Sequence, residues 1–166
     1  MSSSTIDAVV ARAAGTGAAT WSMGGLFERL VSGAETGGLL DVSLVTQPQG
    51  IATPLHVHTR EAEAWYLLEG TLTYQAGEER VDLEPGGFIY LPRDVPHAFR
   101  TTSAVRYLAL ALPGNVMDLY DEVGAPAPER RLPDGGVTGD DVARWLTAAP
   151  GYGLRVVGPP IPEAAT

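Results

Sequence analysis

The sequence predicts an all-β fold, a jelly-roll barrel of two sheets followed by C-terminal helices. Three observations lead to this prediction. Strand-like runs that alternate apolar and polar residues fill the chain from about residue 21 to residue 112. Turn clusters rich in Gly and Pro separate them, giving about eight to ten short strands at the spacing of a double-sheet jelly roll. After Pro113 the apolar residues change to helical spacing.

Length and composition favour one domain and exclude several classes of function. The chain has 166 residues and a net charge of -9, which argues against nucleic acid or an anionic membrane surface as a partner. It has no cysteine, so disulfides and thiolate sites are excluded. The N-terminus lacks the basic cluster and long apolar run of a signal peptide, and no stretch approaches the ~20 apolar residues that span a bilayer. A cytoplasmic protein is expected.

The expected elements divide the chain into three segments of this single domain. Residues 1–20, rich in Ala, Gly and Thr, predict a short helix and a linker. Residues 21–112 form the barrel. Its first strands are expected at 26–31 and 39–45, on either side of a Gly-rich turn, and further strands at 71–75, 80–83 and 105–112.

Residues 113–166 predict a helical extension and a tail that pack on the barrel. Asn115 can cap a helix that ends at Gly124. A second helix is expected from Thr138 or Asp140, and its apolar face is formed by Val142, Trp145 and Leu146. The tail, residues 152–162, is expected to be extended, with Pro159 and Pro160 preventing regular structure.

Residues 50–70 contain two of the three histidines. Successive side chains of a strand alternate faces, so His56 and His58 leave the same face, about 7 Å apart at the backbone. Glu63 follows five residues later, an offset that places it on the opposite face of a straight strand. If residues 59–62 instead form a hairpin turn, Glu63 begins the return strand and its carboxylate can reach back toward the histidines.

The third histidine, His97, belongs to a second stretch, residues 86–101. A tight loop at 92–96 is expected to deliver it at the start of a strand. Three imidazoles and one carboxylate suit one divalent transition metal per chain (Fe, Mn, Co, Ni, Cu or Zn) and suit Ca or Mg poorly. A buried histidine is more often a hydrogen-bonded core residue than a ligand, but here no histidine lies outside the two stretches.

Together, the two stretches resemble the two motifs of the cupin superfamily. The first motif is filled at every fixed position, by Gly50, His56, His58, Glu63 and Gly70. The second is matched by Gly86, Pro92 and His97. Asp94 stands where the family usually has glycine, and Thr101 where it often has asparagine; aspartate tolerates the left-handed backbone region, so we expect the turn to be kept. The resemblance implies a metal held by His56, His58, Glu63 and His97 inside a cupin double-stranded β-helix.

The order of barrel, helix end at residues 122–126 and late Val-Val-Gly-Pro-Pro resembles the single-barrel quercetinase-like dioxygenases of bacteria. That resemblance implies oxidative cleavage of a flavonol or related enolic aromatic with O2, with Glu63 acting as ligand and general base. Two other classes stay open. One is a non-oxidative metal-dependent cupin such as an isomerase, lyase or polyketide cyclase, and the other is a ligand-binding cupin with a structural metal.

The expected substrate pocket contains aromatic residues beside the ligands. Trp65 has the parity of Glu63 and Phe99 that of His97, so both are expected to point inward, and Tyr90 is a further candidate. Core packing is the alternative for each. Because the C-terminal helices have apolar faces and twofold dimers are common, a homodimer is also predicted.

Overall fold

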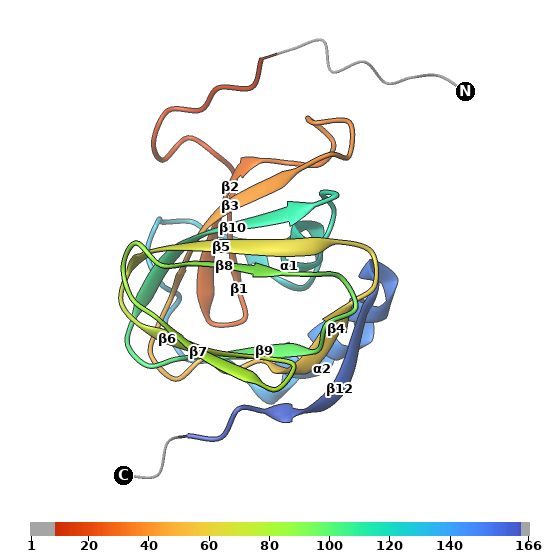
Figure 1. Cartoon of the computed structure of the whole chain (residues 1–166). Coiled ribbons are helices and arrows are strands. Elements are labelled where there is room, and N and C mark those ends of the chain that lie inside the picture. The colour runs from red at the N-terminus through yellow and green to blue at the C-terminus, as the bar shows by residue number, and fades with distance from the viewer. Residues whose placement is uncertain (1–8, 164–166) are drawn as a thin grey trace, which may run out of the picture.

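The computed structural model describes residues 9–163 and shows two antiparallel sheets that face each other (Figure 1). The first sheet has the order β11-β1-β2-β3-β10-β5-β8. Its strands are β1 (Ala19–Ser22), β2 (Gly25–Val31), β3 (Asp41–Gln47), β5 (Ala62–Glu69), β8 (Phe88–Leu91), β10 (Val105–Leu112) and β11 (Ala125–Pro126).

The second sheet has the order β12-β4-β9-β6-β7. Its strands are β4 (Pro54–His58), β6 (Leu72–Ala76), β7 (Glu79–Leu83), β9 (His97–Thr101) and β12 (Leu154–Pro160). Trp65 and Tyr107 stack between the sheets, with ring centroids 3.9 Å apart, and Phe99 meets Trp65 edge-on. The jelly-roll prediction is therefore confirmed.

Two α-helices follow the barrel, α1 (Met117–Val123) and α2 (Gly139–Ala148), with a 3-10 turn at Ala149–Tyr152. The first begins after Val116 without a side-chain cap, so Asn115 does not have the predicted capping role. The second begins at Thr138 with a capping box, in which the Thr138 hydroxyl and the Asp141 carboxylate each satisfy the other residue's backbone N–H. No helix among residues 9–163 is long and apolar enough to cross a membrane.

Both ends of the predicted barrel need correction. Residues 9–18 contain no helix; the rest of the predicted helix, residues 1–8, lies outside the described part of the chain, and β1 starts at Ala19. The tail is not irregular, because Leu154–Pro160 pairs with β4. Proline is tolerated there because β12 is an edge strand, whose outward N–H groups have no strand to pair with.

Candidate metal centre

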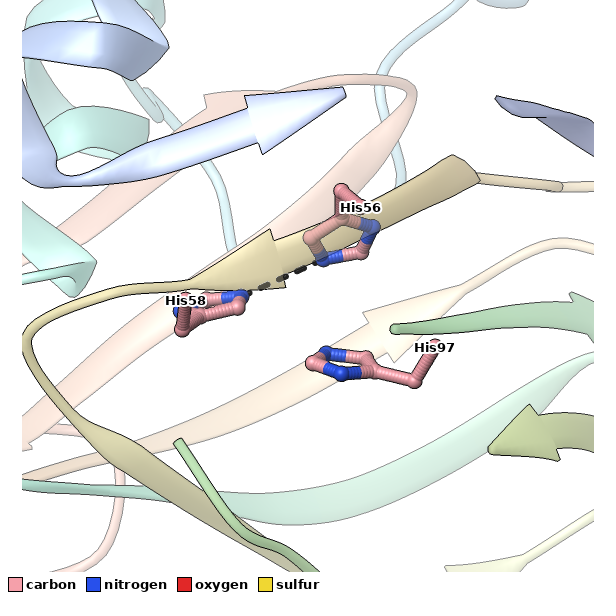
Figure 2. A group of neighbouring side chains, drawn as sticks. All are labelled: His56, His58 and His97. Atoms are coloured by element: carbon pink, nitrogen blue, oxygen red, sulfur yellow. Dashed lines mark hydrogen bonds between the residues drawn. The ribbon is translucent and has the colours of Figure 1, made fainter. Parts of the chain in front are cut away.

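Two neighbouring strands of the second sheet place the three histidines together. His56 on β4 and His97 on β9 are direct cross-strand partners, and His58 lies two residues further along β4 on the same face. All three imidazoles are buried, and each offers one ring nitrogen, the three atoms lying within 4.8 Å of one another. Figure 2 shows the rings converging on one point.

The fourth predicted ligand arrives from the opposite sheet. Glu63 lies on β5, which pairs with β10 and β8 and not with β4, so the hairpin interpretation is wrong. Residues 59–61 instead cross from one sheet to the other, and the carboxylate faces the histidines across the barrel interior. Glu63 Oε2 is 3.4 Å from Nε2 of His58 and 3.4 Å from Nε2 of His97.

The other nitrogen of each imidazole is held by an acceptor. His56 Nδ1 lies 2.8 Å from the Pro54 carbonyl and His97 Nδ1 lies 2.9 Å from the Val95 carbonyl. A carbonyl can only accept, so Nδ1 carries the proton in both rings and Nε2 presents its lone pair to the centre. This tautomer is the one required of a histidine that binds a metal through Nε2.

His58 differs because its Nδ1 hydrogen-bonds to the carboxylate of Glu61, a residue that is 1% exposed. Carboxylate–histidine pairs of this kind orient metal-binding imidazoles and raise their basicity. Sequence reasoning assigned this residue to a polar turn and missed its contact. Its only signal was the position of a carboxylate three residues after a candidate ligand.

Two observations show that a cation fits this centre. His97 Nε2 is buried and has no hydrogen-bond partner among residues 9–163. His56 Nε2 lies 3.2 Å from His58 Nε2, the contact drawn as a dashed line in Figure 2. Two imidazole lone pairs at that separation repel unless a proton or a metal lies between them. The donor set therefore fits a divalent transition metal.

The charges of the centre also favour a metal. Burial disfavours the ionised form of Glu63, but the adjacent His58 and His97 outweigh it and lower its pKa to about 2. Burial, with His97 and His58 close by, lowers the pKa of His56 to about 4. Burial opposes protonation of His58, but Glu63 and Glu61 outweigh it and raise the pKa of His58. The ionised Glu63 and the neutral His56 are therefore ready to bind a cation, and binding through His58 releases its proton.

A cavity of about 660 Å³ opens beside this centre. Among residues 9–163, Glu63 is the only charged side chain that lines it; most of the rest are apolar, including Trp65, Phe99, Tyr107 and Trp145. The predicted inward position of Trp65 and Phe99 agrees with this lining. Tyr90 does not line the cavity and is 57% exposed on the outer face of β8, which corrects its predicted placement.

The second helix closes part of the cavity, with Trp145 buried and its ring edge-on to His56 at 6.2 Å. Val142 and Leu146 line the mouth and are 40% and 45% exposed. The apolar face predicted for this helix is therefore directed at the barrel opening.

Comparison with known proteins finds a family match in the middle of the chain. Residues 43–111 match the Cupin domain family. A quercetin 2,3-dioxygenase of Bacillus subtilis (strain 168) is 34% identical over 98 residues, which are 58% of this chain and 29% of that protein. The chain thus spans less than a third of the length of this relative.

Solved structures share the fold at low sequence identity. A predicted oxalate decarboxylase from Thermotoga maritima superposes with a TM-score of 0.55 at 20% identity, covering 63% of this chain and 99% of the other. KdgF from Halomonas sp. gives a TM-score of 0.52 at 18% identity, covering 57% of this chain and 85% of the other. At these identities the likeness concerns the fold alone.

Proposed function

The chain belongs to the cupin superfamily, with its cupin domain at residues 43–111, and from this premise we propose that it is a metal-dependent dioxygenase that cleaves a flavonol or related enolic aromatic with O2. One observation carries the proposal. The 660 Å³ cavity is apolar and lined by aromatic rings, and the only charged group that lines it in the described part of the chain is a predicted metal ligand, Glu63. This arrangement suits a flat, largely uncharged substrate with one acidic hydroxyl. The 34% identity to a quercetin 2,3-dioxygenase supports the same class.

His56, His58, His97 and Glu63 would hold the metal, a divalent ion of the first transition row. When bound, the metal supplies a Lewis acid for the substrate oxygen and a redox centre at which O2 reacts. Glu63 is ionised, since its neighbours lower its pKa to about 2, which also makes it a weak base. Because the substrate hydroxyl would be acidified by the bound metal, the Glu63 carboxylate could accept the proton that this hydroxyl loses. The proton moves from the substrate oxygen to Glu63, and the substrate is left as the enolate.

The walls of the cavity orient the substrate and exclude water. Trp65 and Tyr107 lie parallel, 3.9 Å apart, and Tyr107 donates a hydrogen bond of 3.0 Å to Gln47 Oε1, so these walls are fixed by packing before substrate binds. A small dianion such as oxalate would leave most of this apolar lining without contact. The cavity therefore favours an aromatic substrate over a small organic acid.

The test combines metal analysis with oxygen uptake. We expect about one metal per chain in the purified protein, loss of that metal in His58→Ala, and quercetin-dependent oxygen consumption by the metal-loaded form. Bound metal without oxygen uptake across a series of flavonols would favour the non-oxidative alternative, an isomerase, lyase or cyclase. No metal in either protein would contradict the site itself.

We also propose a homodimer, through a surface different from the helices first considered. The outer face of β3, β10, β5 and β8 carries two cross-strand rows without a charged side chain. One row is Leu44, Leu108, Tyr66 and Phe88, and the other is Val42, Leu110, Ala64 and Tyr90. A sheet with one face on its core normally presents polar residues on the other face. In a chain of net charge -9, these two uncharged rows are where a second copy meets the least repulsion.

A further inference from the structure

A second cavity of about 370 Å³ adjoins the first and differs from it in chemistry. Its lining includes Asp134, Asp141 and Arg144, together with Ser22, whose buried hydroxyl has no hydrogen-bond partner among residues 9–163. The residues that line both cavities are Met23 and Gly136. Met23 therefore stands between an apolar chamber beside the metal centre and a polar chamber farther out.

The backbone of Met23 is unfavourable for its side chain. Met23 and Gly24 form the two-residue turn between β1 and β2, with φ values of 47° and 71°. Positive φ at both positions is typical of a type I′ hairpin turn, for which Asn-Gly is the preferred pair. Glycine at the second position fits this preference, but methionine at the first does not, because an unbranched apolar side chain gains no local hydrogen bond that would offset the left-handed backbone.

Tertiary contacts hold the turn in this conformation. Met23 packs against the hydrophobic core. A Cβ atom on Gly24 would lie 2.9 Å from Val137 Cγ2 and 3.3 Å from Ile51 Cδ1, and both of these residues line the apolar cavity. The turn is thus pressed against the cavity wall. A strained residue that persists at such a place points to a function for its side chain.

We propose that Met23 is a specificity-determining residue: its side chain closes the apolar cavity toward the polar one and contacts the aromatic part of the substrate remote from the metal. That the substrate is aromatic rests on the proposed function, but the separation of the two cavities by the Met23 side chain does not. Methionine suits this role because its flexible thioether adapts to ring edges and faces. Asparagine would fit the backbone better and would join the two cavities.

The experiment separates strain from cavity shape by means of two variants. Met23→Asn is expected to raise the melting temperature by about 2–4 °C, since it relieves the backbone. It should also weaken binding of Nile red, an uncharged aromatic dye, about tenfold, and move the emission of the bound dye to longer wavelength. Met23→Leu keeps both the strain and the apolar wall, so its dye affinity should stay near that of the unmodified chain.

Asp94→Gly is the matched control. Asp94 also has positive φ, at 65°, but it lines neither cavity, so its substitution should leave dye affinity and emission unchanged. A lower melting temperature in Met23→Asn, or an unchanged dye affinity, would overturn the proposal, as would failure of the unmodified chain to bind the dye. Dye binding needs neither metal, oxygen nor flavonol, so a failure of the dioxygenase proposal would show separately, as absent oxygen uptake.

Discussion

The carboxylate of Glu61 accepts a hydrogen bond from Nδ1 of His58 inside the barrel, where both residues are almost fully buried. Each of the three histidines donates a hydrogen bond from Nδ1. Glu61 is the only charged acceptor among the three, because His56 and His97 donate to backbone carbonyls. A buried carboxylate here both fixes the imidazole ring and makes it a stronger donor to a cation.

We therefore expect Glu61→Ala to lower metal affinity about 10- to 100-fold, and Glu61→Gln to lower it less, since the amide oxygen can still accept from Nδ1. The measurement is chelator competition against the metal-loaded protein. Glu84→Ala, on an exposed turn, is the control and should bind metal as the unmodified chain does. Equal affinity in all variants would show that His58 needs no charged partner.

The mouth of the cavity gives a second prediction. Val142 and Leu146 are half-exposed and line the opening, so a charge at either position can be introduced without burying it in the core. Leu146→Asp and Val142→Asp should each weaken binding of an uncharged aromatic by about tenfold, with little change in melting temperature.

Ala143→Asp tests whether a charge on the same helix is enough to cause the effect. This residue is exposed on α2 and does not line the cavity. Its ligand affinity should therefore stay unchanged. If the control weakens binding as much as the two mouth variants, the effect comes from the overall charge of the helix and not from contact with the ligand.

The convergence of three histidines could be predicted from the sequence, because strand alternation places His56 and His58 on one face and the proline loop delivers His97 beside them. The turn at Asp94 was predicted on similar grounds and has the expected positive φ. The route of Glu63 could not be predicted, since a four-residue polar segment is equally compatible with a hairpin and with a crossing between sheets. Tyr90 was misplaced for a related reason: aromatic residues mark an outer apolar face as readily as an inner one.

The contact of Glu61 was hidden because carboxylates in polar turns are normally solvated, and only the tertiary fold shows that this one is not. The strain at Met23 was hidden as well. A Met-Gly pair carries no strong turn preference, so its left-handed backbone is decided by the strands that the turn connects.

A buried arginine ties the first helix to the barrel and gives a third prediction. Arg29 lies 3.3 Å from Asp41, 2.9 Å from Asp118 and 2.8 Å from Asp121. Asp41 is fully buried, so removing its cation leaves an uncompensated charge. Arg29→Met should lower the free energy of unfolding at pH 7 by about 3–5 kcal/mol, measured in urea. Asp118→Asn, at a half-exposed position, should cost less than about 1 kcal/mol.

The loss in free energy of unfolding caused by Arg29→Met should depend on pH in a defined direction. Burial raises the pKa of Asp41, and Arg29 opposes that rise. Without the arginine the folded-state pKa rises further, so the folded protein takes up a proton before the unfolded chain does, and acidification favours folding. The loss of stability should be largest at pH 7 and shrink as the pH falls toward 4. A deficit that grows on acidification would contradict this account of Asp41.

The outer apolar face of the first sheet gives the last prediction. Phe88 and Tyr90 are 60% and 57% exposed on β8, the terminal strand of that sheet, and Tyr66 lies beside Phe88 on β5. If two copies bury this face against each other, the sedimentation mass should equal two chains. Phe88→Glu and Tyr90→Glu should each convert the dimer to a monomer with metal content unchanged, because neither side chain points toward the histidines. Val157→Glu is the control, since Val157 is 45% exposed on β12, in the other sheet, and lines neither cavity, so its substitution should leave the dimer intact. A monomeric unmodified chain, or a dimer that survives both glutamate substitutions, would place the subunit contact elsewhere or exclude it.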